Sequence, residues 1–220
     1  RCSKVTGVSG LRVANSAVFV LTWPGHFAWA ARAESENSRA TTSTSPSGPS
    51  SMAISPTPVS ASRFAKAGAA VCSNASSYRR GEDVPLLLPE INAEHIQLVK
   101  HQRKNKGWSG CIVTNPNCTS TGLTIALKAL DDAFGVQKVF AVSLQALSGA
   151  GYPGVPSLDI MDNVIPNVGN GGEEEKVEWE PRKMLGKLNG NKIELAEITF
   201  SAHTNRVAVI DGHTVCASVE

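Results

Sequence analysis

Apolar and polar positions follow recognisable periods from about residue 63 onwards. Short apolar runs predict strands at 69–72, 111–114, 137–145, 192–200, 206–210 and 214–219. Apolar residues at helical spacing predict helices at 63–67, 91–104, 121–134 and 173–185. Strands alternate with helices up to about residue 120, and strand-rich sequence follows. This order predicts an α/β fold that continues into an α+β region.

The segment 41–62 has a different texture, because 16 of its 22 residues are Ser, Thr or Pro. Such a segment buries too little apolar surface to offset the entropy lost on ordering. We therefore expect it to be a loosely held loop and interpret residues 1–62 as a degenerate or disordered N-terminal region. The Gly- and Pro-rich segment 148–170 is expected to be a second long loop.

Charge and cysteine usage exclude several classes of function. The net charge is +2, with 21 basic and 19 acidic residues, which does not indicate a nucleic-acid partner. No apolar run approaches the roughly 18 residues of a membrane span, so we expect no membrane association. Five cysteines without a C-x-x-C pair or metal-ligand spacing indicate free thiols in a reducing compartment, the cytoplasm, and no metal site.

Cys118 is the strongest candidate for chemistry. It follows the predicted strand 111–114 and the turn 115–117, and a predicted helix comes directly after it. Unpaired backbone N–H groups and the helix dipole favour a thiolate at such a position, and the same N–H groups can stabilise an oxyanion. A buried cysteine after a strand can also be no more than a small apolar residue.

Seven short blocks stand in a specific order along the second part of the chain. They are CSNASSYR at 72–79, NPNCT at 115–119, QALSGAGYPG at 145–154, DNVIP at 162–166, EEEK at 173–176, KMLG at 183–186 and NRV with DGHT within 205–214. These blocks resemble the aspartate-semialdehyde dehydrogenases, in their fungal and archaeal branch, over residues 63–220. Without the resemblance, the three glutamates at 173–175 are interpreted as charges that suit the first turn of a helix.

The resemblance implies a reaction and an architecture. The reaction is the NADP-dependent reductive dephosphorylation of L-aspartyl-4-phosphate to L-aspartate 4-semialdehyde through a cysteine thioester, in lysine, methionine and threonine biosynthesis. The architecture is a partial Rossmann-like NADP-binding domain at 63–117, followed by an incomplete α+β catalytic and dimerisation domain with a mixed sheet at 118–220. The partners implied are the small-molecule substrate, inorganic phosphate and further copies of the chain in a homodimer or homotetramer.

The resemblance also implies a role for each matching residue. Cys118 would be the nucleophile and His213 the general acid/base. The substrate-binding residues would be Arg206, Glu180, Gln145 and Asn117. Arg79 and Lys183 would bind the phosphate, and Ser73, Asn74, Ser148 and Gly149 would line the cofactor.

The chain departs from the family at both ends and in one helix. Only Gly7 and Gly10 remain of the expected glycine-rich phosphate loop, the chain stops at Glu220, and Pro181 lies inside a predicted helix. We therefore expect a poor or inactive catalyst, and the first alternative is a non-catalytic dimerising fragment of that enzyme.

Two other activities remain open at this stage. One is that of a different acyl-phosphate reductase with the same thiol mechanism. The other is that of a cysteine hydrolase using Cys118 and His213. A hydrolase of this kind needs a third group that orients the imidazole.

Overall fold

A computed structural model of the protein describes residues 9–13, 16–23, 52–54 and 58–220, the first three segments and residues 58–60 by their backbone alone. These residues form two compact units, each of which is described here by itself. One comprises 118–182 and 197–220 together with the strands at 9–13 and 16–23, and we call it the mixed-sheet unit. The other comprises the described residues up to 117 together with 183–196, and we call it the parallel-sheet unit.

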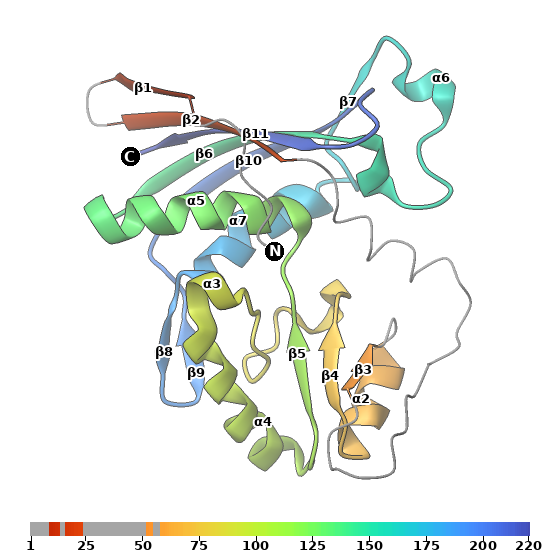
Figure 1. Ribbon diagram of the computed structural model, residues 1–220, viewed down its shortest axis with the longest axis vertical. Coiled ribbons are helices and arrows are strands. Elements are labelled where there is room, and N and C mark those ends of the chain that lie inside the picture. The colour runs from red at the N-terminus through yellow and green to blue at the C-terminus, as the bar shows by residue number, and fades with distance from the viewer. Residues whose placement is uncertain (1–8, 14–15, 24–51, 55–57) are drawn as a thin grey trace. The chain divides into compact units, whose positions relative to one another are not determined.

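The mixed-sheet unit is built on six strands in the order β1-β2-β11-β6-β10-β7 (Figure 1). The strands are β1 (Ser9–Val13), β2 (Ser16–Trp23), β6 (Lys138–Gln145), β7 (Val164–Pro166), β10 (Thr199–Val207) and β11 (His213–Val219). β10 pairs with β6 in parallel, and the other neighbouring pairs are antiparallel. The predicted α/β class with a mixed sheet is therefore confirmed.

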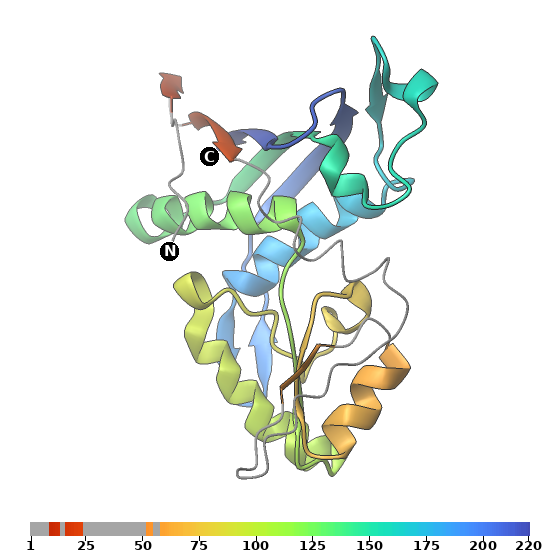
Figure 2. The same cartoon turned by 45° about the vertical axis from the view of Figure 1, so that its right-hand side comes forward.

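Two helices, α5 (Cys118–Phe134) and the greater part of α7 (Gly172–Met184), cover one face of this sheet (Figures 1 and 2). Alternate residues of β11, from His213 to Val219, are buried beneath them, and Leu123 and Leu127 of α5 are fully buried. Every second residue is buried in the strand, and residues four apart are buried in the helix. These spacings place the apolar side chains of each element on one face, so that the two faces can pack together.

Carboxylates of α7 cap the outer edge of β10. The backbone N–H of Thr204 donates to Glu174 Oε1 at 2.9 Å, and the N–H of Ala202 donates to Glu178 Oε1 at 3.0 Å. Since β7 pairs with β10 only at 205–207, these two N–H groups belong to a stretch of edge that β7 does not reach. Glu174 and Glu178 of α7 thus accept hydrogen bonds from backbone N–H groups at the edge of the sheet. Their function is not limited to interaction with the helix dipole.

The parallel-sheet unit has three parallel strands in the order β3-β4-β5. Its elements are β3 (Met52–Ile54), α2 (Pro58–Lys66), β4 (Ala70–Ser73), α3 (Pro89–Asn92), a 3₁₀ turn at Ala93–Gln97, α4 (Leu98–Lys106), β5 (Cys111–Thr114) and a hairpin of β8 (Lys187–Asn189) with β9 (Lys192–Glu194). Parallel strands joined through helices are a Rossmann-type arrangement, and here they begin before residue 63, with β3 and the start of α2.

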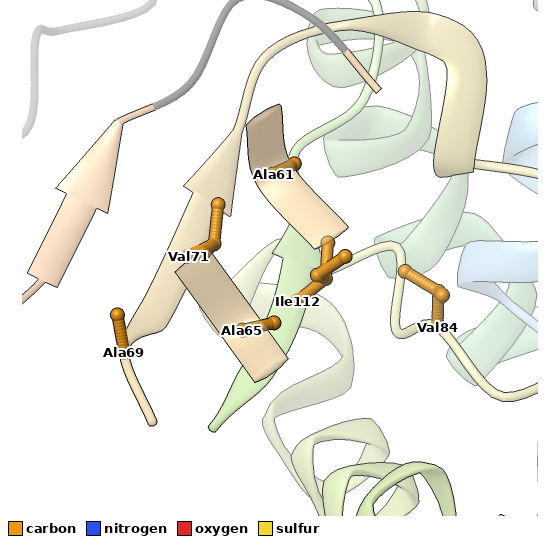
Figure 3. Close-up of a cluster of buried hydrophobic side chains, with 6 residues drawn as sticks. All are labelled: Ala61, Ala65, Ala69, Val71, Val84 and Ile112. Atoms are coloured by element: carbon orange, nitrogen blue, oxygen red, sulfur yellow. The ribbon is translucent and has the colours of Figure 1, made fainter. Parts of the chain in front are cut away.

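Small side chains let α2 pack closely in this unit. Ala61 and Ala65 of α2 lie against Val71, Ile112 and Val84 in a buried cluster (Figure 3). Gly110 is required here, because a Cβ at this position would lie 2.1 Å from the carbonyl oxygen of Ala69. The Gly110 N–H also donates a hydrogen bond of 3.0 Å to the Ala65 carbonyl, which stabilises the close packing of α2 against the backbone at Gly110.

Several expectations from the sequence need correction. Residues 52–54 and 58–62 are not a disordered loop, since they form β3 and the first part of α2. The strands expected at 192–200 and 206–210 are instead β9 and β10, with β10 spanning Thr199–Val207. The segment 148–170 contains a 3₁₀ turn at its start, α6 (Ser157–Ile160) and β7.

Three further details concern the departures noted in the sequence. Helix α7 continues through Pro181, so the proline does not end it. Gly10 lies in strand β1 and not in a turn before a helix, while Gly7 and most of the region 1–51 lie outside the described residues. Among the described residues, no helix is both long and apolar enough to cross a bilayer.

Candidate active site

Three of the predicted site residues stand in a row at one end of the mixed sheet. Arg206 of β10 is paired with Gln145 of β6, and on the other side of β6 Thr214 of β11 stands opposite Leu144, immediately after His213. All three side chains, those of Arg206, Gln145 and His213, are buried on the face that carries α5 and α7. The register of β6, β10 and β11 thus brings three residues that are distant in the sequence next to one another in the sheet.

Helix α5 brings the thiol to this row. It begins at Cys118 itself, not at Thr121, so the cysteine occupies the first turn of the helix. Cys118 Sγ lies 3.4 Å from His213 Nε2. The predicted pair of nucleophile and acid/base is therefore in contact within the mixed-sheet unit.

The backbone of a single residue, Ala146, anchors the two other members of the cluster. The backbone N–H of Ala146 donates to His213 Nδ1 at 3.1 Å. Arg206 donates from Nη1 to the carbonyl oxygen of the same residue, Ala146, at 2.7 Å. The imidazole and the guanidinium are thus held by opposite ends of one residue.

The electrostatics of Cys118 differ from the expectation of a stabilised thiolate. Burial raises the pKa of the Cys118 thiol, and the carboxylate of Glu173 raises it further, while hydrogen bonds from Thr119 and the helix N-terminus act in the opposite direction. Burial disfavours the charged form, and its effect on the pKa of Cys118 outweighs that of the helix N-terminus. The thiol at rest is therefore harder to ionise than a free cysteine.

The two basic groups are shifted toward their neutral forms. Burial and the neighbouring Arg206 lower the pKa of His213, and Glu173 and Asp211 partly oppose this. Burial likewise lowers the pKa of Arg206, against the attraction of Glu173 and Cys118. A neutral imidazole beside a cationic guanidinium is the consistent charge state near neutral pH.

Of the remaining predicted residues of this unit, Gln145 and Glu180 are buried, Ser148 is half-buried and Gly149 is exposed. Gln145 donates from Nε2 to Thr119 Oγ1 at 3.2 Å and to Ser143 Oγ at 3.3 Å. Glu180, on α7, is almost fully buried at 1% exposure. Gly149 lies directly against His213 and Arg206, next to Ser148 in the 3₁₀ turn.

The predicted cofactor- and phosphate-binding residues of the other unit form a second group. Ser73 and Asn74 stand at the carboxyl end of β4, the edge at which parallel sheets bind ligands. Arg79 is buried and donates from Nη2 to the Asn74 carbonyl at 2.7 Å, and Asn115 donates to Asn74 Oδ1 at 2.8 Å. Asn117, also buried, belongs to the same unit.

Lys183 has an unexpected environment for a phosphate ligand. Its ammonium group donates to three backbone carbonyls, those of Arg79 at 2.7 Å, Gly81 at 2.8 Å and Val84 at 2.9 Å. An ammonium has three donors, so this set occupies all of them in the present conformation. Lys183 shapes the loop that carries Arg79, and its role as a phosphate ligand stays a prediction.

Two participants were missed from the sequence. Glu173 was interpreted as a helix-terminal charge, yet its carboxylate acts on the pKa values of Cys118, His213 and Arg206 together. Ala146 contributes only backbone atoms, for which its side chain gives no signal. Within the described part of the chain, no cluster of three His, Cys, Asp or Glu residues is suited to a metal ion.

Comparison with known proteins shows which family the chain resembles. Residues 52–99 match the model of the semialdehyde dehydrogenase NAD binding domain, and residues 127–220 match that of the semialdehyde dehydrogenase dimerisation domain. The aspartate-semialdehyde dehydrogenase of Archaeoglobus fulgidus is 60% identical over 158 residues, and that of Schizosaccharomyces pombe is 51% identical over 161 residues.

The chain belongs to the aspartate-semialdehyde dehydrogenase family. These two relatives align with 72% and 71% of the chain, and the match covers 45% and 44% of their own lengths. The chain thus spans about half the length of the family members that it matches.

Solved structures of the family have the same fold. The enzyme of Candida albicans, crystallised with NADP, superposes with a TM-score of 0.63 at 43% identity, over 71% of this chain and 45% of that one. The second aspartate-semialdehyde dehydrogenase of Vibrio cholerae gives a TM-score of 0.60 at 28% identity, over 77% and 55% of the two chains.

Proposed function

We propose that the chain carries the acyl-transfer centre of an aspartate-semialdehyde dehydrogenase. The reaction is the reductive dephosphorylation of L-aspartyl-4-phosphate to L-aspartate 4-semialdehyde. The observation that supports it best is the contact of 3.4 Å between Cys118 Sγ and His213 Nε2, with Arg206 and His213 both bonded to the backbone of Ala146. Thiol, imidazole and guanidinium are the three groups that acyl-phosphate chemistry on an amino acid requires.

Each group has a defined task in this proposal. The Cys118 thiolate attacks the acyl carbon, the carbon–oxygen bond to phosphate breaks, and a thioester forms with release of inorganic phosphate. Arg206 binds the substrate carboxylate through its guanidinium, and Glu180 binds the amino group. When the thioester is reduced, the oxyanion that forms is stabilised by the N–H groups at the start of α5 and by His213. Return of the electron pair to sulfur releases the aldehyde.

Phosphate binding is assigned to the loop that precedes α3. Arg79 supplies the guanidinium that would neutralise the leaving phosphate. The three carbonyls bonded to Lys183 lie in this same loop, so Lys183 supports the loop in the resting conformation. Direct participation of Lys183 would require it to exchange at least one carbonyl for a phosphate oxygen.

NADP is the cofactor that we propose, since residues 52–99 match an NAD binding domain and the Candida albicans relative binds NADP. Bound NADPH would supply the hydride. Ser73 and Asn74 fit its nicotinamide end, because they offer a hydroxyl and an amide at the ligand-binding edge of the sheet. The pyrophosphate end fits less well, since Gly10 lies in a strand and, in the described part of the parallel-sheet unit, no glycine-rich turn leads from a strand into a helix.

The cytoplasm is the location that we propose. Cys72, Cys111, Cys118 and Cys216 are free thiols, which fits a reducing compartment.

Turnover tests this proposal. The chain is supplied with the semialdehyde, inorganic phosphate and NADP⁺, and formation of NADPH is followed, with Cys118→Ser as the matched control. We expect slow formation of NADPH that requires phosphate and is lost in the Cys118→Ser variant. Equal rates in the two proteins, or a rate independent of phosphate, would overturn the proposal.

A second candidate function is that of a dimerising fragment without catalysis. The mixed sheet has one face covered by α5 and α7, while its other face exposes Phe140 and His203, whose rings meet edge to face with centroids 5.7 Å apart. Residues 127–220 match a dimerisation domain, so we propose that this face packs against a second copy of the chain.

Sedimentation of Phe140→Asp against Phe134→Asp tests this surface. Phe134 is 73% exposed but lies at the end of α5, away from the open face. A dimer that dissociates only in Phe140→Asp supports the surface, and equal behaviour of the two variants contradicts it.

A further inference from the structure

The turn that follows β6 touches both basic groups of the site. We call Ala146–Gly149 the 146–149 turn. Its first residue donates its N–H to His213 Nδ1 at 3.1 Å and accepts a hydrogen bond from Arg206 Nη1 at 2.7 Å. A turn with both bonds on one residue fixes the imidazole and the guanidinium relative to each other.

The same turn is bonded to the loop that joins β10 to β11. The N–H of Leu147 donates to the Val209 carbonyl at 2.7 Å, and the N–H of Ser148 donates to the Ile210 carbonyl at 3.0 Å. This loop lies between Arg206 and His213 in the sequence, so its position sets where both side chains begin. The 146–149 turn therefore fixes the loop between Arg206 and His213 and also bonds to the side chains of these two residues.

The last residue of the turn must be a glycine for reasons of space. A Cβ on Gly149 would lie 2.8 Å from His213 Cε1 and 2.9 Å from Arg206 Nη1. A Cβ atom essentially never lies this close to another heavy atom, so the imidazole of His213 and the guanidinium of Arg206 would have to move. Gly149 has no left-handed backbone angle, which means that the absence of a side chain is the requirement.

The hydrogen bond from Ala146 decides which nitrogen of His213 carries the proton. A backbone N–H can only donate, so Nδ1 must present its lone pair. The neutral imidazole then carries its hydrogen on Nε2, the nitrogen that lies 3.4 Å from Cys118 Sγ. An imidazolium would place a second hydrogen on Nδ1, directly against the Ala146 N–H.

The charged groups around His213 come from four parts of the mixed-sheet unit. They are Arg206 from β10, Asp211 from the loop before β11, Glu173 from α7 and the thiol of Cys118 from α5. Arg206 and burial favour the neutral ring, whereas Glu173 and Asp211 favour the charged one. The balance lowers the pKa of His213, in agreement with the geometry of its Nδ1 bond.

We infer that the 146–149 turn is a positioning element that holds His213 as the neutral Nε2-protonated tautomer facing Cys118, and that Gly149 is essential to it. In this state His213 donates a hydrogen bond from its Nε2–H to the sulfur of Cys118. The chemical meaning of this inference rests on the proposed function. Its test needs neither substrate nor cofactor, so the two can fail separately.

The tautomer is measured on the unaltered protein. Imidazole ¹⁵N resonances are recorded near neutral pH, and His213→Asn identifies the resonances of His213. We expect an Nε2–H, Nδ1-unprotonated ring. A ring protonated at Nδ1, or an equal mixture of tautomers, would overturn the inference without any glycine variant being required.

The glycine is tested by the reactivity of each thiol. Iodoacetamide labelling is followed by peptide mass spectrometry in Gly149→Ala and in Gly172→Ala, whose added Cβ meets nothing within 4 Å. Loss of the hydrogen bond to the sulfur should slow alkylation of Cys118 in Gly149→Ala about tenfold, with the exposed Cys72 unchanged and Gly172→Ala unaltered. Wild-type labelling of Cys118 in Gly149→Ala would contradict the inference.

Discussion

His95 and His213 are both buried, one in each unit, and both receive a hydrogen bond at Nδ1. His95 accepts there from the Asn92 amide at 3.0 Å and donates from Nε2 to the Gly186 carbonyl at 3.1 Å. His213 accepts from the Ala146 N–H, but its Nε2 faces the sulfur of Cys118. A histidine with both nitrogens bonded to amide groups supports a fold, whereas a histidine anchored at one nitrogen presents the other to a reactive atom.

The cations of the two units differ in the same way. Lys183 of the parallel-sheet unit gives its three donors to three backbone carbonyls. Arg206 of the mixed-sheet unit is anchored at Ala146 through one of its five donors. All four side chains are buried, and the number of internal partners distinguishes the structural group of each pair from the one with a proposed chemical role.

Replacing Lys183 should have the largest effect on stability. Lys183→Met removes the common partner of three carbonyls, two of which belong to buried contacts, and should lower the free energy of unfolding by about 3–4 kcal/mol. Urea unfolding measures this, with the partly exposed Lys128→Met as control. If Lys183→Met were as stable as the unaltered protein and lost only its binding of phosphate, Lys183 would be a phosphate ligand. That result would contradict the structural role that its three carbonyl partners indicate.

The two histidines should separate stability from reactivity. His95→Asn should lower the free energy of unfolding by about 2–3 kcal/mol, because two internal partners lose their bonds. Labelling of Cys118 should be unchanged in this variant. His213→Asn should cost only about 1 kcal/mol and should slow Cys118 alkylation about tenfold. Urea unfolding measures the stability of both variants, and peptide mass spectrometry measures the labelling of Cys118. A larger loss of stability in His213→Asn, or slower labelling in His95→Asn, would contradict the distinction between the two histidines.

Protonation of His95 and His213 at acid pH should destabilise the folded protein. The pKa values of His95 and His213 are lowered in the folded state from 6.5, so unfolding takes up protons as the pH falls below that value. Their contribution to stability is present above pH 6.5 and is lost as the pH falls through the folded pKa values, by up to about 1.4 kcal/mol per pH unit for each proton. Urea unfolding between neutral and mildly acid pH should show a smaller slope in His95→Asn, and an unchanged slope would exclude His95 as a source.

The carboxylates that cap β10 should have the smallest effect. Glu178→Ala leaves the Ala202 N–H without its acceptor and should cost about 1 kcal/mol. Glu175→Ala, on the exposed side of the same helix, should cost less than about 0.5 kcal/mol. Equal losses on thermal unfolding would show that these glutamates act through helix charge and not through the sheet edge.

Periodicity predicted the elements whose buried positions are apolar. The strand at Cys111–Thr114 was predicted with its observed bounds, and the helix at 121–134 was missed only in its first turn. β10 was divided wrongly because its buried positions include Thr204 and Arg206, which interrupt the apolar alternation on which the prediction depends. The strand–turn–helix around Cys118 was local and therefore visible in the sequence.

The rest of the site depends on register, which a single sequence does not reveal. Arg206 and His213 are seven residues apart on two different strands, and only their pairing on either side of β6 brings them together. Their roles were predicted from resemblance and not from spacing. Ala146 acts through its backbone, and Glu173 has the sequence context of an ordinary helix start, so neither gave a signal.

Acylation of Cys118 without cofactor tests the central claim most directly. The chain is mixed with L-aspartyl-4-phosphate in the absence of NADPH, quenched in acid, digested and analysed by mass spectrometry, with released phosphate measured in parallel. We expect one aspartyl group on the Cys118 peptide, released phosphate in equal amount, and neither in Cys118→Ser. Phosphate release without a label on Cys118, or a label that persists elsewhere in Cys118→Ser, would contradict the account.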